Sequence, residues 1–158
     1  MTPEGIKKKR VSVGDRIPDF TLKDQDGNEV STEDILGRGP VVLYFYPKDE
    51  TPGCTKEACY FRDQYEAFTD EGAQVIGVSS DSVGSHKKFA EHYNLPFKLL
   101  ADEGGKLRKE FRVPSSAGIL PGRVTYIIDK DGIVRMTFSS QLNLLGHIQT
   151  ALEKIRSM

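Results

Sequence analysis

The chain has 158 residues, of which 37% are hydrophobic and 28% are charged, and its formal net charge is −1. This length predicts one domain with a core large enough to fold without a disulfide scaffold or a structural metal. The small net charge gives no electrostatic reason to expect nucleic acid or an anionic membrane as a partner, and no segment approaches the roughly 20 apolar residues that span a bilayer. The basic run 7–10 predicts a flexible N-terminal arm over residues 1–10, followed by a single domain over residues 11–158.

The first part of the chain predicts a hairpin, a short helix and a buried strand. Turn residues separate two short β-type segments, and Ser31 is a good N-cap for a brief helix. A continuous apolar, β-branched and aromatic run then indicates a strand buried on both faces. The predicted elements are strands 17–22 and 29–30, a helix over 31–36 and a strand over 41–46.

The rest of the chain alternates between helical and extended patterns and ends in a hairpin and a helix. We predict helices 54–68, 85–93 and 104–111, strands 74–79, 97–100, 124–128 and 133–138, a loop over 114–122, and a last helix with one apolar face over 144–155. Such alternation indicates a layered α/β domain. The pattern does not determine the order of the strands.

Both cysteines lie in one segment, where the strand 41–46 passes through a Pro/Gly loop into a helix. The first turn of a helix favours negative charge, and the thiolate is the reactive form of cysteine, so Cys54 is a candidate nucleophile. At 100° per residue, Cys54 falls on the same apolar stripe as Ala58, Phe61 and Phe68, whereas Cys59 lies about 140° around the helix. We therefore expect the Cys54 sulfur to face the interior.

Helix geometry bears on whether Cys54 and Cys59 can form a disulfide. Cα atoms five residues apart in an ideal helix are separated by roughly 8.7 Å, and a disulfide needs about 7 Å or less. A disulfide between them would require the first turns to unwind. The alternative is that both cysteines pack as small hydrophobic residues. A metal site is disfavoured, because the spacing is unusual for zinc and no histidine is near in sequence. Two cysteines in a chain of this size favour a reducing compartment such as the cytoplasm.

The segment around Cys54 resembles the active-site signature of the peroxiredoxins, with Pro47, Thr51 and Cys54 at the characteristic spacing. The longer run DETPGCTKEACYFRD over residues 49–63 is similar to the bacterioferritin comigratory protein / peroxiredoxin Q branch. The similarity continues in VIGVS over 75–79, LAD over 100–102 and LPGRVTYIID over 120–129, and it covers nearly the whole chain after residue 11.

This resemblance implies a thioredoxin-like α/β fold, with a central mixed sheet flanked by helices and an N-terminal β-hairpin extension. It implies a peroxidatic role for Cys54 and a resolving role for Cys59. Thr51 matches the threonine that engages thiolate and peroxide, Pro47 the proline that shields the pocket, and Arg123 the arginine that approaches from the other half of the fold. A guanidinium is always charged and would favour the thiolate. Judged without the resemblance, Arg123 is more simply a surface arginine on a strand.

The implied activity is reduction of hydrogen peroxide and of alkyl or lipid hydroperoxides, without a cofactor or metal, by a monomer. Cys54 would become a sulfenic acid, Cys59 would condense with it to a disulfide, and thioredoxin, or in some relatives glutaredoxin, would reduce that disulfide. The resemblance also adds the plastid stroma as an alternative compartment. Two other functions stay open: a protein disulfide oxidoreductase, which the lack of a Cys-x-x-Cys pair disfavours, and a redox-sensing interaction protein.

The remaining titratable residues near these motifs have simpler interpretations. His86 shares a helical face with apolar residues and is expected to be a partly buried packing residue, while His92 and His147 are expected at polar or boundary positions. Asp49 and Glu50 are expected to be solvated, with a role for Glu50 in orienting Arg123 or the loop as the alternative. Asp129 and Asp131 are expected to form the turn of the second hairpin.

Overall fold

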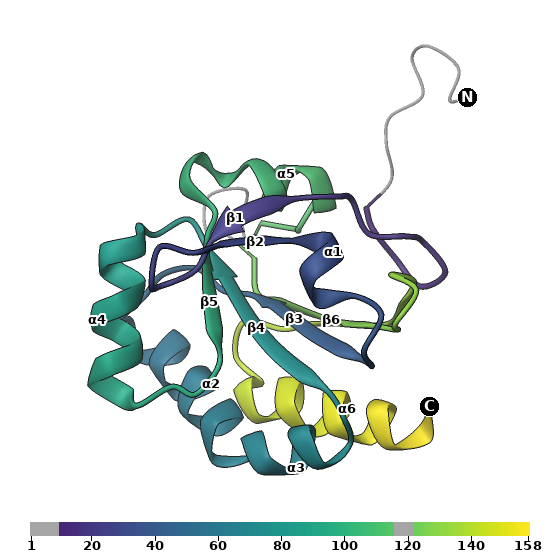
Figure 1. The fold of residues 1–158 in the computed structure, drawn as a ribbon. Helices are drawn as coiled ribbons and strands as arrows, with labels where there is room; N and C mark the ends of the chain where they lie inside the picture. Colours follow the sequence, from purple (N-terminus) through teal and green to yellow (C-terminus); the bar gives the residue numbers. More distant parts are fainter. Residues whose placement is uncertain (1–9, 116–121) are drawn as a thin grey trace.

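The structure, a computed structural model, describes residues 10–115 and 122–158; residues 1–9 of the expected arm and part of the expected loop 114–122 lie outside this range. Within it, a mixed sheet has the strand order β2-β1-β5-β4-β3-β6-β7 (Figure 1). The strands are β1 Thr21–Lys23, β2 Glu29–Ser31, β3 Val41–Phe45, β4 Gln74–Ser79, β5 Lys98–Ala101, β6 Val124–Ile128 and β7 Val134–Ser139. The helices are α1 Thr32–Ile35, α2 Pro52–Asp63, α3 Tyr65–Asp70, α4 Val83–Tyr93, α5 Lys106–Phe111, preceded by a 3-10 turn Glu103–Gly105, and α6 Leu144–Ser157. The expected mixed sheet flanked by helices is confirmed.

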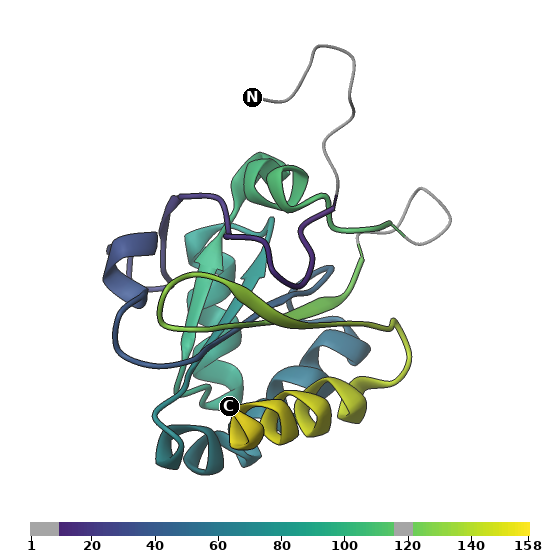
Figure 2. The same ribbon diagram turned by 90° about the vertical axis from the view of Figure 1, so that its right-hand side faces the viewer.

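Two apolar clusters cover opposite faces of the sheet, and β3 contributes to both. Its residues alternate: Val42 and Tyr44 pack with α2, α3, α4 and α6, whereas Val41, Leu43 and Phe45 pack with α1, α5 and the N-terminal segment. Figures 1 and 2 show these two helix layers on either side of the sheet. Strand β3 is buried along its whole length, as its unbroken apolar sequence predicts.

Two predicted elements differ from the structure. The expected helix 54–68 is two helices, because Gln64 adopts φ −103° and ψ 7° and turns the chain between α2 and α3. That turn allows Phe61 and Phe68 to be fully buried, with ring centroids 5.8 Å apart. The expected strand 17–22 is also shorter: only its end pairs with β2, while Ile17 donates a backbone hydrogen bond to Gly132 in the second hairpin.

Strand order decides which loops meet at the site. β3 is parallel to β4 and antiparallel to β6, with Phe45 opposite Val124 and Val78. The residues that follow Phe45 and those that precede Val124 therefore emerge at the same edge of the sheet. Loop 46–51, which leads into α2, lies there beside Arg123. Over the described ranges, no helix is both long and apolar enough to cross a membrane.

Candidate active site

The first turn of α2 places Cys54 in the core. Thr51 is the N-cap in an extended conformation and Pro52 is the first helical residue, a position where proline's missing N–H costs nothing. Cys54 is the third helical residue, 1% exposed, and it joins the apolar cluster with Ala58 and Phe61. Its sulfur faces the interior, as the stripe predicts, at the helix end that favours a thiolate.

Arg123, the residue immediately before β6, reaches Cys54 in α2. Its Nη2 lies 3.5 Å from Cys54 Sγ, and its Nη1 donates to Glu57 Oε1 at 2.7 Å. The side chain is 5% exposed, so the simple interpretation of Arg123 as a surface residue is wrong. Gly53 leaves it room, because a Cβ at that position would stand only 3.1 Å from Nη2. One guanidinium thus bridges the thiol and a buried carboxylate, a geometry that favours the charged form of both.

Glu57 belongs to this site although the motif analysis did not single it out. It is fully buried, and burial raises its pKa to about 7 against the opposing effect of Arg123. Its Oε2 and the Nε of Arg123 are buried atoms without a hydrogen-bond partner in the described part of the chain. A sequence signal existed: Glu57 lies three residues after Cys54, so a charged side chain shares the helix face of the thiol.

His147 lies behind Glu57 and is buried, not at a boundary as expected. Burial lowers its pKa to about 4, so its imidazole is neutral at neutral pH. Its Nε2 donates to the Ser140 carbonyl oxygen at 2.7 Å, and Nδ1 then accepts from the Thr125 hydroxyl at 2.7 Å. Nδ1 is 3.6 Å from Glu57 Oε2. The neutral ring leaves Arg123 as the cation that faces Glu57.

A second guanidinium holds the two strand ends together. Arg108 of α5 donates from Nη1 to the Gly122 carbonyl and from Nη2 to the Tyr46 carbonyl, both at 2.8 Å. These carbonyls immediately precede Arg123 and Pro47 in the chain. Arg108 therefore fixes the spacing between loop 46–51, which carries Thr51, and the segment just before β6, which carries Arg123.

The remaining candidates lie around this centre. Pro47 is half-buried at the end of β3, and the Thr51 hydroxyl, also half-buried, donates to the Lys48 carbonyl at 2.7 Å. Cys59 lies further along the same intact helix and is half-buried; burial raises its pKa, with Arg62 acting in the opposite direction. Both cysteines are free thiols. The structure thus brings Cys54 and Arg123 together and leaves Cys59 on a different face.

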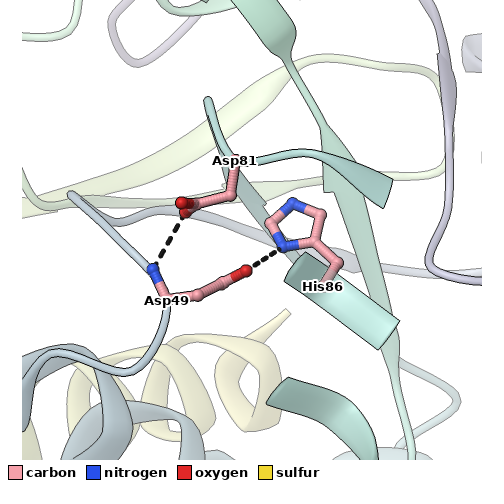
Figure 3. Close-up of side chains that lie close together, drawn as sticks. All are labelled: Asp49, Asp81 and His86. Carbon is pink, nitrogen blue, oxygen red and sulfur yellow. Dashed lines mark hydrogen bonds and ion pairs between the residues drawn. The ribbon is translucent and has the colours of Figure 1, made fainter. Parts of the chain in front are cut away.

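The loop residues Asp49 and Glu50 differ sharply from each other. Asp49 is 5% exposed, so the expectation of a solvated side chain is wrong; its carboxylate accepts from the Tyr46 hydroxyl at 2.6 Å and from Ser85 at 2.8 Å. Glu50 is exposed as expected, and its carboxylate lies 3.1 Å from Nδ1 of His92, not on Arg123. Within the described ranges, Asp49, Asp81 and His86 form a group with ligand-type atoms within 4.8 Å (Figure 3).

Asp129 forms the turn of the second hairpin, as expected. Its Oδ1 accepts from the backbone N–H of Asp131 and of Ile133, at 2.9 and 3.1 Å. These bonds hold its pKa low against the effect of burial.

Comparison with known proteins places these features in a family. The AhpC/TSA family profile matches residues 13–137. The chloroplast protein peroxiredoxin Q of Sedum lineare is 53% identical over 150 residues, which cover 94% of this chain and 80% of that protein. The crystal structure of peroxidoxin BcpB from Mycobacterium tuberculosis superposes with a TM-score of 0.88 at 39% identity, covering 94% of this chain and 99% of the other.

A second solved structure, the Xanthomonas campestris bacterioferritin comigratory protein, has a TM-score of 0.80 at 28% identity over 87% of this chain and 90% of its own, and is described for its alkyl peroxide reduction activity. The family profile covers most of the chain, and the mixed sheet with its flanking helices superposes on the thioredoxin-like fold of these proteins. The chain therefore belongs to the AhpC/TSA family and, within it, to the peroxiredoxins of the Q and bacterioferritin comigratory type, which are thiol peroxidases.

Proposed function

We propose that Cys54 is the peroxidatic cysteine, and one observation carries the assignment: a buried thiol in the first turn of α2 lies 3.5 Å from a guanidinium. The thiolate is the nucleophile, and both the helix end and Arg123 stabilise it. Cys59 has neither feature, since it lies in the middle of α2 and burial raises its pKa. The two thiols therefore take different roles.

In the first step the Cys54 sulfur attacks the terminal oxygen of a hydroperoxide. The S–O bond forms as the O–O bond breaks, Cys54 becomes a sulfenic acid, and the leaving alkoxide takes a proton to become an alcohol or water. Negative charge moves from sulfur onto the departing oxygen, where Arg123 Nη2 can donate. The Thr51 hydroxyl, whose hydrogen goes to the Lys48 carbonyl, can accept from the hydroperoxide O–H. Pro47 covers the loop side of the pocket and limits access of water.

In the second step the Cys59 thiol loses its proton and attacks the Cys54 sulfenic acid; the S–S bond forms as the S–O bond breaks, and the departing hydroxide takes a proton to leave as water. Both residues lie in one intact helix with Cys54 fully buried, so the first turns of α2 must unwind before the sulfurs meet. An external dithiol then reduces the disulfide by exchange. Thioredoxin is the reductant we propose, with glutaredoxin as the second candidate.

The substrates are hydrogen peroxide and alkyl or lipid hydroperoxides, and the working unit is a monomer that uses no cofactor. Peroxide as substrate class follows from the family, and the alkyl peroxide activity named for the Xanthomonas protein supports organic hydroperoxides. For the compartment, the chloroplast location of the plant relatives supports the plastid stroma, the alternative to the cytoplasm in the sequence-based prediction.

The test is a coupled assay in which thioredoxin and its reductase supply electrons and peroxide is limiting, with hydrogen peroxide compared with a bulky lipid hydroperoxide. We expect many turnovers per chain with both. A redox sensor would consume one equivalent and stop, and a disulfide oxidoreductase would reduce or form protein disulfides without peroxide. Either result would overturn the proposed function.

A further inference from the structure

In loop 46–51, which leads into α2, the side chain of Asp49 takes part in a cluster of hydrogen bonds with Tyr46, Ser85 and His86. Its Oδ2 lies 2.6 Å from His86 Nδ1 (Figure 3). Its Oδ1 accepts from the Tyr46 hydroxyl, and Oδ2 also accepts from Ser85. His86 is 0% exposed and comes from α4, whereas Cys54 lies in α2. Asp49 thus connects loop 46–51 to α4 through the fully buried His86 and the half-buried Ser85.

Proton counting defines the state of this pair. His86 Nε2 lies 2.9 Å from the Leu100 carbonyl oxygen, which only accepts, so Nε2 carries a hydrogen. Nδ1 faces a carboxylate oxygen at 2.6 Å, and a second proton must lie between these two atoms. A neutral imidazole has a single N–H, so Asp49 and His86 together hold one proton more than a carboxylate and a neutral ring. The net charge of the pair is therefore zero. No further charged residue is required to balance it, and its burial leaves no uncompensated charge in the protein interior.

The backbone of Asp49 is fixed as well. Its N–H donates to Asp81 Oδ2 at 2.9 Å, and the Ser79 hydroxyl donates to the same oxygen. The next residue, Glu50, has φ +64°, a left-handed conformation that non-glycine residues adopt only when neighbouring contacts impose it. Thr51, the N-cap of α2, follows directly. The cluster on Asp49 thus determines how the chain enters the helix that carries Cys54.

These contacts also argue against a metal ion at this cluster. Both oxygens of Asp49 and both ring nitrogens of His86 already take part in hydrogen bonds, and Asp81 Oδ2 accepts two. A cation would have to displace them.

We propose that Asp49 and His86 are positioning residues for the peroxide reaction: the pair holds loop 46–51 in the geometry in which Thr51 and Cys54 meet the peroxide. This inference rests on the proposed role of Cys54. It assigns no contact between His86 and substrate. Loss of the Asp49 contact lets Glu50 relax from its left-handed conformation, which moves the N-cap and the first turn of α2.

The test separates the two hydrogen bonds of His86. In His86→Asn the side-chain amide can replace Nδ1 toward Asp49, whereas in His86→Gln it can replace Nε2 toward Leu100. The rate of Cys54 oxidation by hydrogen peroxide is measured by rapid quenching, alkylation and mass spectrometry in a Cys59→Ser background. We expect His86→Gln to slow the reaction on the order of tenfold to a hundredfold, and His86→Asn to recover a clear part of that loss.

The matched control is Asp24→Asn, which changes another buried aspartate. Asp24 is 1% exposed and lies in the turn between β1 and β2, outside loop 46–51. We expect it to react at the parent rate. Equal rates for the parent and both His86 variants, or a faster reaction for His86→Gln than for His86→Asn, would overturn the inference. If the parent itself does not react with peroxide, the proposed function fails instead.

A milder variant covers the case in which the His86 variants do not fold. Ser85→Ala removes one donor to Asp49 Oδ2 and leaves His86 in place. We expect a severalfold slower oxidation of Cys54 and faster amide hydrogen exchange at 51–56 than in the parent, with α6 unchanged. An unchanged rate and unchanged exchange would exclude a positioning role for this cluster.

Discussion

Cys54 and Cys59 share one helix, yet the two ends of their segment have different surroundings. Cys54 is 1% exposed and meets the guanidinium of Arg123, the residue just before β6, and the same guanidinium also binds the buried carboxylate of Glu57. Cys59 is half-buried, and the charges that act on it, Arg62 and Asp63, come from its own helix and oppose each other. The contrast teaches that position in the helix and tertiary contact act together: Cys54 lies in the first turn of α2, whereas Cys59 lies in its middle. Of the two thiols, Cys54 is the one that also meets a guanidinium from a distant part of the sequence.

Exchanging each cysteine for serine gives the largest effects. Cys54→Ser is expected to abolish peroxide consumption, because the nucleophile is gone. Cys59→Ser is expected to consume one equivalent per chain, accumulate the sulfenic acid and lose turnover with thioredoxin. Trapping with a sulfenic-acid reagent and mass spectrometry distinguishes the two. Normal turnover by Cys59→Ser would show that another group resolves the sulfenic acid.

Removing the guanidinium comes next in size. Arg123→Ala is expected to slow Cys54 oxidation on the order of 10²–10³-fold, the effect of losing a donor aimed at developing charge. Arg123→Lys keeps the charge but cannot bridge Cys54 and Glu57 with a planar fork, so we expect an intermediate rate. The thiolate absorbance in the ultraviolet should fall in parallel. Arg135→Ala, which removes a half-exposed arginine paired with Asp129, serves as the control and should leave the rate unchanged.

Glu57→Gln sharpens the comparison through pH. Burial raises the pKa of Glu57 from 4.5 to about 7, so the folded state favours its protonated form. The contribution of Glu57 to the free energy of unfolding is therefore fully present below pH 4.5 and is lost as pH rises through 7. Burial lowers the pKa of His147 from 6.5 to about 4, so the folded state favours its neutral form. The contribution of His147 to the free energy of unfolding is therefore present above pH 6.5 and is lost as pH falls through 4. The two trends oppose each other in the wild type.

In Glu57→Gln the trend from His147 is left alone. We therefore expect the unfolding free energy of this variant, relative to wild type, to rise from pH 4.5 to 7 by on the order of 3 kcal/mol. Urea denaturation at several pH values measures it. Parallel pH profiles for the two proteins would contradict the raised pKa of Glu57.

The smallest effect is expected at Cys59. Arg62 lowers the pKa of Cys59 against the effect of burial, so Arg62→Gln should raise that pKa further and slow disulfide formation by no more than about threefold. Oxidation of Cys54 should not change. Single-turnover measurement of both steps checks this. A loss as large as that of Arg123→Ala would mean that the charges around the two thiols are comparable after all.

The sequence predicted the local part of the site well, and its errors have a common cause. The position of Cys54, its inward direction and the helical setting of Cys59 follow from periodicity and from helix geometry. Asp49 and His147 were placed wrongly, because each is buried by residues distant in sequence: Asp49 by His86 of α4, and His147 by Thr125 of β6. The helical pattern also predicts Gln64 in a helix interior, whereas the structure turns the chain there, between the fully buried Phe61 and Phe68.

By itself, the sequence determined that a cysteine stands at a helix entry after a buried strand, with a second cysteine five residues on and facing elsewhere. These are consequences of local backbone geometry. Only the tertiary structure decided that Arg123 faces Cys54, because this depends on β6 pairing antiparallel to β3 with Val124 opposite Phe45. It also decided that Asp49 is buried and hydrogen-bonded to His86 and not a solvated loop residue, because burial depends on the neighbouring elements and not on the residue type.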